Sequence, residues 1–144
     1  MLSSAWLSPL YPDRVTAIKS ILIVDDNQTI RAAVRSFLQE QRGILVCGEA
    51  VDGFDALEKA HTLRPDLIVL DLSMPQMNGL ETARILRANA VPVPIILFTM
   101  YAEELRPQDA TEAGIDAVVA KEDLTVLHHQ IEKLLVISPH RTLT

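Results

Sequence analysis

The sequence predicts an α/β fold of the (βα)5 type, in which five strands alternate with five helices in a doubly wound sandwich. Two observations carry this prediction. Five short apolar runs recur along the chain, and such continuous runs are typical of parallel strands buried on both faces. The segments between them repeat apolar residues at the spacing of an amphipathic helix. Since right-handed crossovers join parallel strands, we expect helices on both faces of one sheet.

The five predicted strands are runs rich in Ile, Val, Leu and Ala that end at a polar residue or a turn signal. They span residues 21–24, 44–47, 67–71, 95–99 and 116–120. Such lengths are usual for strands of a globular domain. The runs are therefore long enough to form a complete five-stranded sheet.

The segments between these runs carry the apolar stripes and capping residues of helices. Asn27, Asp52 and Asp123 stand where a side-chain oxygen can cap the first, second and last helix. The stripe positions are Ile30, Ala33, Val34, Phe37 and Leu38 in the first helix, Ala56, Leu57 and Ala60 in the second, Leu80, Ala83 and Leu86 in the third, and Leu124, Leu127, His128, Ile131, Leu134 and Leu135 in the last.

The fourth helix is predicted to be short. Pro107 falls within its segment, and a proline is tolerated in a first turn but costs about 3 kcal/mol in a helix interior. We therefore expect this helix to begin near Arg106 or Pro107 and to close at Gly114.

A chain of 144 residues fits one domain. We expect an irregular N-terminal extension over residues 1–18, the domain over 19–137 and a flexible tail over 138–144. The extension contains prolines and serines without an apolar period. An alternative is that Trp6 and Leu10 dock on the domain or on a partner.

Composition excludes several classes of protein. A net charge of −6 argues against a general nucleic-acid binder, which needs a basic face. The single cysteine, Cys47, excludes a disulfide framework and a cysteine zinc site, and it is predicted to be a buried, inert thiol. No run approaches the roughly 20 apolar residues of a membrane span. The N-terminus is a poor signal peptide, so we expect a cytoplasmic protein.

Polar residues follow four of the five predicted strands. They are Asp25, Asp26, Asp71, Thr99 and Lys121. The carboxyl ends of parallel strands meet at one edge of the sheet, where ligands bind in such folds. Singly, each residue is explained as a helix cap or a solvated loop residue, but their joint occurrence indicates a site. Residues 49–51, which end the second strand, contribute nothing obvious.

The residue types indicate phosphoryl chemistry. Clustered carboxylates repel each other, and a hard cation such as Mg²⁺ relieves the repulsion. A carboxylate beside Mg²⁺ is a potential nucleophile toward phosphorus. The Thr99 hydroxyl and the Lys121 ammonium are suited to bind the phosphoryl oxygens.

The chain resembles the receiver domain of two-component response regulators, in the CheY-like superfamily, over residues 19–137. The resemblance rests on the five strand-end residues in order and on the frame D-L-S-M-P-Q-M-N-G, which starts at Asp71. It implies a flavodoxin-like sheet with strand order 2-1-3-4-5. It also implies two-component signal transduction rather than a turnover enzyme.

The resemblance further implies roles for individual residues. Asp71 looks like the phosphoacceptor, which takes a phosphoryl group from a sensor histidine kinase or a phosphotransfer protein. Asp26, Asp71 and the backbone carbonyl of Ser73 would ligate Mg²⁺, and Asp25 would act through a bound water. Thr99 would swing toward the phosphoryl group, and Lys121 would pair with it.

Some positions depart from the family pattern. Val118 stands where the family has its switch aromatic residue, and Pro107 interrupts the output helix. We therefore expect activation by a weaker or altered route through the fourth helix. Glu122 follows the lysine where many receivers have proline, so no cis peptide is expected there. Met100 replaces the small residue common after the threonine, so we expect narrower access to the phosphoryl group. Ser73 and the bulky Tyr101 occupy positions that tune hydrolysis in the family, so we expect slow self-dephosphorylation.

The resemblance also sets expectations about partners. A downstream protein partner or a covalent output domain would read the switch, and a homodimer through the fourth and fifth helices is possible. No helix-turn-helix is recognisable after Ile137, so direct nucleic-acid binding by this chain is not expected. His61, His128 and His129 are expected on solvated or half-buried helix positions without a phosphotransfer role.

Three alternatives stay open. The first is a phosphorylation-independent pseudo-receiver that only binds proteins. The second is a receiver fragment of a regulator with a LuxR-type DNA-binding domain. The third, a haloacid-dehalogenase-type enzyme, is suggested by residues 25–29, but Asn27 replaces the acid that would serve as general acid/base.

Overall fold

The computed structural model describes residues 18–143 of the chain. Within this range five parallel strands form one sheet in the order β2-β1-β3-β4-β5, which confirms the predicted fold and strand order. The strands are β1 (Lys19–Val24), β2 (Ile44–Ala50), β3 (Leu67–Leu70), β4 (Ile95–Thr99) and β5 (Ala117–Ala120). The helices are α2 (Gln28–Gln39), α3 (Gly53–Leu63), α4 (Gly79–Ala88), α5 (Pro107–Glu112) and α6 (Leu124–Leu143). Except for Ile18, the predicted N-terminal extension lies outside the described residues, as do Trp6 and Leu10.

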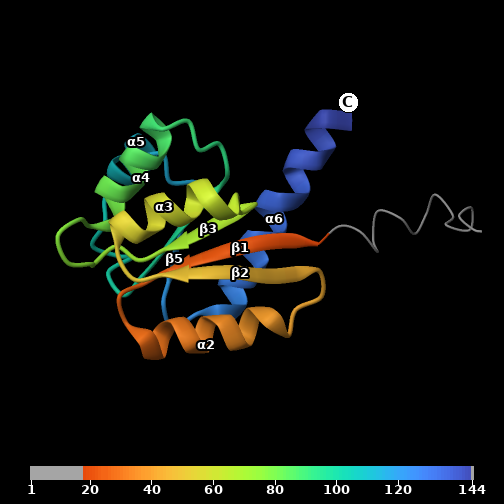
Figure 1. Cartoon of the computed structure of the whole chain (residues 1–144), viewed down its shortest axis with the longest axis horizontal. Coiled ribbons are helices and arrows are strands. Elements are labelled where there is room, and N and C mark those ends of the chain that lie inside the picture. The colour runs from red at the N-terminus through yellow and green to blue at the C-terminus, as the bar shows by residue number, and fades with distance from the viewer. Residues whose placement is uncertain (1–17, 144) are drawn as a thin grey trace, which may run out of the picture.

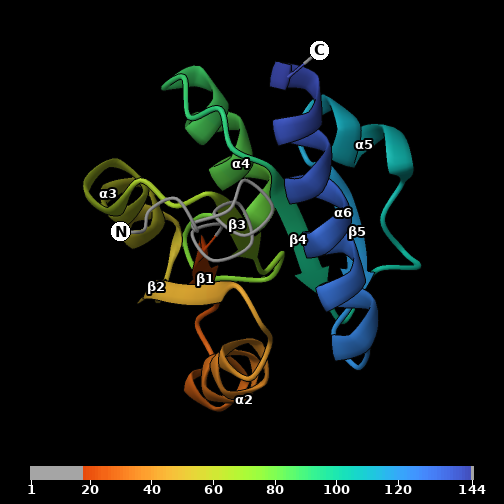
Figure 2. The same ribbon diagram turned by 90° about the vertical axis from the view of Figure 1, so that its right-hand side faces the viewer.

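Helices cover both faces of the sheet, as the doubly wound prediction requires. Figure 1 shows α3 and α4 on one side of the strands and α2 on the other, and Figure 2 shows α2 and α6 flanking the sheet in the turned view. One apolar core joins α3, α4 and α5 to the sheet, and a second joins α2 and α6 to its opposite face.

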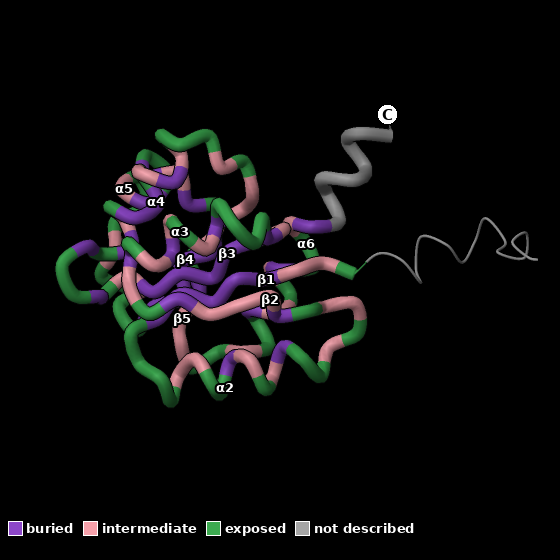
Figure 3. Tube along the Cα trace, viewed as in Figure 1, coloured by how far each residue is buried: buried purple, intermediate pink, exposed green. Residues whose placement is uncertain are grey.

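The central strands are the most deeply buried part of the molecule. All residues of β3 and β4 are buried, and they form the purple centre of Figure 3. The edge strands β2 and β5 are only partly buried. This gradient explains why the central runs read as continuous apolar sequence.

Strand β2 is longer than predicted and contains an irregularity. The sequence predicted residues 44–47, but pairing with β1 continues to Ala50. The register skips Cys47 between Val46 and Gly48, so this residue is the extra one of a bulge. Cys47 was predicted to be buried but is only half-buried, because it lies on an edge strand; its burial still raises the pKa of the thiol, which disfavours the reactive thiolate.

The predicted caps Asn27 and Asp52 are confirmed, while side-chain capping by Asp123 stays a prediction. The side chains of Asn27 and Asp52 accept hydrogen bonds from the backbone N–H groups of Ile30 and Asp55. Helix α5 begins at Pro107, where a missing N–H costs nothing, and is short as predicted. The prediction for Ala33 was wrong, because this residue is exposed while Val34 and Leu38 carry the buried stripe of α2.

Helix α6 is longer than the sequence predicted. We expected the chain to fray from Ser138, but the helix continues to Leu143, while the domain bounds at residues 19 and 137 stay predictions. The prediction relied on Pro139 as a stop signal. A proline removes only one backbone N–H, and here the backbone stays helical on both sides of it.

Candidate functional site

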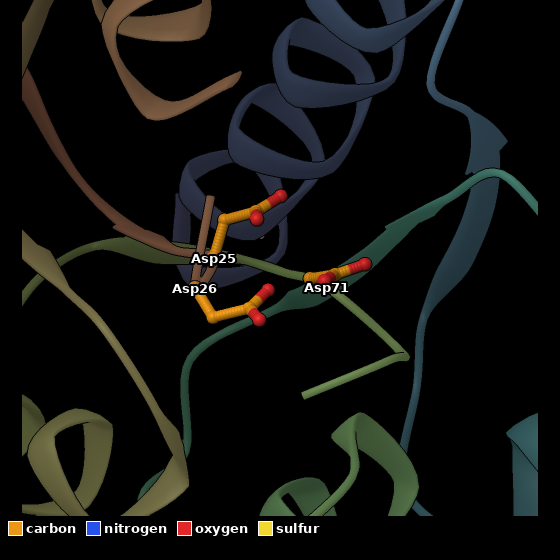
Figure 4. A group of neighbouring side chains, drawn as sticks. All are labelled: Asp25, Asp26 and Asp71. Atoms are coloured by element: carbon orange, nitrogen blue, oxygen red, sulfur yellow. The ribbon is translucent and has the colours of Figure 1, made fainter. Parts of the chain in front are cut away.

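Three carboxylates gather at the carboxyl edge of the sheet. Strands β1 and β3 are neighbours, and the register pairs Val24 with Leu70, so Asp25 and Asp71 leave the sheet side by side. The backbone N–H of Asp71 donates to the carbonyl of Val24 over 2.9 Å. One carboxylate oxygen from each of Asp25, Asp26 and Asp71 lies within 4.8 Å of the others. Figure 4 shows the three side chains gathered together. Asp25 and Asp71 are buried and Asp26 is exposed.

Lys121 joins this cluster from the end of β5. Its Nζ lies 2.7 Å from Oδ2 of Asp25 and 3.1 Å from Oδ1 of Asp71. The backbone N–H of Lys121 donates to the carbonyl of Thr99, which fixes the residue at the sheet edge. One ammonium therefore neutralises part of the charge of the two buried acids.

The electrostatics of the cluster favour a further cation. Burial, and then repulsion by Asp25, raise the pKa of Asp71 above its usual range, although the hydrogen bond from Lys121 opposes this. Burial lowers the pKa of Lys121, but its hydrogen bonds to Asp25 and Asp71 prevail and raise it. Lys121 contacts two of the three carboxylates and carries a single positive charge, so negative charge remains in the cluster. Oxygen donors of this kind are suited to Mg²⁺.

Thr99 is fully buried at the end of β4, next to the strand that carries Asp71. Its Oγ1 accepts a hydrogen bond from the backbone N–H of Tyr101 over 3.0 Å. The hydroxyl is thus part of the edge that the sequence predicted, and it is engaged by the loop that leads to α5. Tyr101 and Met100 are exposed.

The turn after Asp71 is tightly built. The N–H of Gly79 donates to the carbonyl of Leu72 over 2.8 Å, and Asn78 and Glu81 form a reciprocal capping box at the start of α4. A Cβ on Gly79 would collide with the carbonyl oxygen of Asp71. This close approach requires glycine and sets the path of the backbone beyond Asp71. Ser73 lies in this turn and is exposed.

Two residues that the sequence analysis missed support the site. Nη1 of Arg31 donates to the backbone carbonyl of Asp25 over 2.6 Å, and its Nε lies 2.9 Å from Oε1 of Glu49. The hydrogen bond from Arg35 lowers the pKa of Glu49 despite partial burial. Residues 49–51 had been judged uninformative. The only signal was an acid at the end of the strand beside β1, and many exposed acids have that position.

Other predicted residues lie away from the cluster or have structural roles. Asn27 caps α2 with its side chain and donates its N–H to Oδ1 of Asp25. Both hydrogen bonds indicate a structural role for this residue. His61 and His129 are exposed and His128 is half-buried, edge-on to Phe37, as expected for helix positions. Residues 18–143 contain no cis peptide, in line with the expectation for Glu122.

A family model described as "Response regulator receiver domain" matches residues 21–132. The response regulator protein VraR of Staphylococcus saprophyticus is 37% identical over 101 residues, which cover 70% of this chain and 48% of that protein. The VraR protein of Staphylococcus aureus is 35% identical over the same shares. The chain thus spans about half the length of the curated relatives it matches.

Solved structures show the same similarity. The response regulator domain of Thermotoga maritima CheB superposes with a TM-score of 0.76 at 26% identity and covers 82% of this chain and 96% of that one. A LuxR-family two-component response regulator from Aurantimonas gives 0.77 at 30% identity, with 83% and 86% covered. A LuxR-family DNA-binding response regulator from Staphylococcus aureus gives a TM-score of 0.74 at 25% identity, with 82% of this chain and 99% of that one covered.

Among the described residues, none of the helices has the length and apolar character of a membrane span.

Proposed function

The chain belongs to the receiver domains of two-component response regulators, and on that premise we propose that it accepts a phosphoryl group on Asp71. The observation that carries the proposal is the contact of one ammonium, Lys121, with two buried acids at the sheet edge. Here Asp71 is buried beside a second acid, and its pKa is raised, which is typical of a functional carboxylate.

The proposed reaction is the transfer of a phosphoryl group from the phosphohistidine of a sensor histidine kinase or phosphotransfer protein. A carboxylate oxygen of Asp71 attacks phosphorus and forms a P–O bond. The P–N bond to histidine breaks, and its electron pair returns to the ring nitrogen, which takes up a proton. The product is an acyl phosphate, and the chain itself is consumed as a substrate rather than acting as a turnover enzyme.

Mg²⁺ is the proposed cofactor. Asp25, Asp26 and Asp71 supply oxygen donors close enough to share one ion, and the backbone carbonyl of Ser73 is the fourth proposed contributor. When bound, the cation would neutralise charge on the phosphoryl oxygens. The exposed Asp26 leaves one side of the cluster open to solvent, so an ion can enter.

Lys121 and Thr99 are proposed to detect the phosphoryl group. The Lys121 ammonium already lies 3.1 Å from Asp71, so it is placed to pair with a phosphoryl oxygen. The Thr99 hydroxyl would exchange its bond with the Tyr101 N–H for one to the same group. That exchange would release the loop after β4 and bias α5, β5 and α6 between two arrangements.

The relay beyond Thr99 is proposed to differ from the usual one. Val118 is partly exposed on β5 and has no ring to rotate, and α5 starts only at Pro107. We therefore expect a smaller shift of residues 100–112 on phosphorylation. Structures with and without the phosphoryl group that superpose throughout this segment would contradict any switch of this kind.

Two further expectations belong to this proposal. A cytoplasmic location fits a phosphoryl donor that draws on ATP. A partner or an output domain of the kind found in LuxR-type regulators would read the switch, since LuxR-family structures are among the matches. Phosphorylation-dependent pairing through α5 and α6 is one way to engage it, and a pseudo-receiver would engage it without phosphate.

Labelling with acetyl phosphate tests the proposed function. The wild-type protein with Mg²⁺ should gain one phosphoryl group by intact mass, and the Asp71→Asn variant should gain none. Asp109→Asn is the matched control, because Asp109 is paired with Arg106 on α5, outside the cluster. Equal labelling of wild type and Asp71→Asn would show that Asp71 is not the acceptor, and no labelling of wild type would favour the pseudo-receiver.

A further inference from the structure

The guanidinium of Arg31 connects the carboxylate cluster to the neighbouring strand. This side chain is only 11% exposed, although it starts from the first turn of the surface helix α2. Its Nη1 donates to the carbonyl of Asp25, and its Nε donates to Oε1 of Glu49 on β2. A buried cation is tolerated only with such partners, so the two contacts define one arrangement of the side chain.

Glu49 is held in turn from two helices. Its second oxygen, Oε2, lies 2.6 Å from Nε of Arg35 on α2. Its backbone carbonyl accepts a hydrogen bond from Nζ of Lys59 on α3, 2.5 Å away. Arg31 and Arg35 therefore bind different oxygens of the Glu49 carboxylate, and the contact of Arg31 does not run through Arg35.

The bridge completes the restraint of Asp25. Its Oδ1 accepts the N–H of Asn27, and its Oδ2 contacts Lys121. Only the backbone carbonyl remains, at the point where the chain leaves β1 for α2, and Arg31 takes that position. Without the guanidinium this carbonyl loses its partner, and the segment that carries Asp25 and Asp26 gains freedom.

We propose that Arg31, oriented by Glu49, is a positioning residue that holds Asp25 and Asp26 in the geometry that binds Mg²⁺. The inference deepens the proposed function and rests on it. Arg31 contacts no carboxylate of the cluster in the structure, so it acts through the Asp25 backbone. Partners behind metal ligands typically change metal affinity by about 10- to 100-fold when they are removed.

Arg35 provides a matched control. It binds the same carboxylate as Arg31 but donates to Oε2, and it is 35% exposed. The Arg31→Lys variant keeps the charge but lacks the planar fork that reaches Glu49 and the Asp25 carbonyl together. The Arg35→Gln variant removes one ion pair of Glu49 and leaves the bridge to Asp25 in place. The two variants therefore separate positioning of the site from general loss of an ion pair.

Mg²⁺ titration followed by calorimetry tests the inference. The dissociation constant should rise by about tenfold in Arg31→Lys and by less than about threefold in Arg35→Gln. Glu49→Gln, which retains an oxygen acceptor, should fall between them and serves if Arg31→Lys does not fold. Equal increases of the dissociation constant in Arg31→Lys and Arg35→Gln would overturn the inference. So would increases of the dissociation constant that merely track each variant's loss of unfolding free energy.

Amide hydrogen exchange of metal-free protein separates this inference from the proposed function. The Asn27 N–H, which donates to Asp25, should exchange about tenfold faster in Arg31→Lys and at the wild-type rate in Arg35→Gln. Faster Asn27 exchange in Arg31→Lys would support the inference even if the wild-type protein took no phosphoryl group on Asp71. Failure of that labelling would contradict only the proposed function. Unchanged Asn27 exchange in Arg31→Lys, in a protein that is labelled on Asp71, would overturn the inference alone.

Discussion

The ammonium of Lys121 lies 3.1 Å from Oδ1 of Asp71. The two residues come from strands that are not neighbours, β3 and β5, with β4 between them. Their contact therefore depends on the whole carboxyl edge of the sheet. It also means that the residue proposed to detect the phosphoryl group is already bound to the residue proposed to carry it.

Removal of Lys121 should destabilise the metal-free protein. Lys121→Ala leaves Asp25 and Asp71 buried without their cation, and the expected loss of unfolding free energy is about 1–3 kcal/mol. Urea unfolding in the presence of a chelator measures it. Lys133→Ala, at an exposed position of α6, is the control and should change little. Equal stability of both variants would show that the Lys121 contacts contribute nothing.

Asp71→Asn should stabilise the metal-free protein at neutral pH. The pKa of Asp71 is raised in the folded state by burial and by Asp25, so ionisation of this group opposes folding. The sign follows from linkage: a raised carboxyl pKa gives stability below the unfolded-state pKa that is lost as pH rises through the folded-state pKa. The stabilisation by Asn should therefore shrink as pH falls toward the acidic range. Urea unfolding of both proteins from neutral to acidic pH checks it, and a gap that widens in acid would contradict the assignment.

Mg²⁺ should raise the unfolding temperature of the wild-type protein. Binding to the folded state alone stabilises by about 2.7 kcal/mol at 100 times the dissociation constant. The Asp26→Asn variant, which removes the exposed member of the proposed ligand set, should respond far less, and a chelator should abolish the effect. Thermal scans with Mg²⁺ and with K⁺ at equal ionic strength measure it. Equal shifts of the unfolding temperature by both salts would mean that the cations only screen the charge of the acids and that no Mg²⁺ site is present.

Gly79→Ala should impair phosphorylation of Asp71 by displacing the turn that follows β3. Its Cβ would collide with the carbonyl oxygen of Asp71, so the turn after β3 must move. We expect a loss of unfolding free energy of about 1–3 kcal/mol and slower labelling on Asp71. Ala88→Gly, at the last residue of α4, is a control that alters glycine content without touching the turn. Wild-type labelling rates in Gly79→Ala would show that the turn does not set the position of Asp71.

Much of the fold and the site follows from local sequence signals. The apolar runs of β3 and β4, the caps Asn27 and Asp52, and the late start of α5 at Pro107 all depend on neighbouring residues in the chain. The five strand-end residues could be grouped because parallel strands end at a common edge.

The features that sequence analysis missed depend on tertiary contacts. The partner of Arg31 is one acid among the 19 Asp and Glu residues of the chain, and only the β1–β2 register with its bulge at Cys47 selects Glu49. The exposure of Ala33 depends on how α2 is rotated against the sheet. The course of α6 beyond Ile137 contradicts a stop signal that is reliable only on average.

Mapping the phosphorylated residue tests the central claim most directly. Wild-type protein is incubated with acetyl phosphate and Mg²⁺, digested, and analysed by tandem mass spectrometry. We expect one phosphoryl group, carried by Asp71, and none when a chelator replaces Mg²⁺. A phosphoryl group on His61, His128 or His129, or one on Asp71 that forms equally well in the chelator, would contradict it.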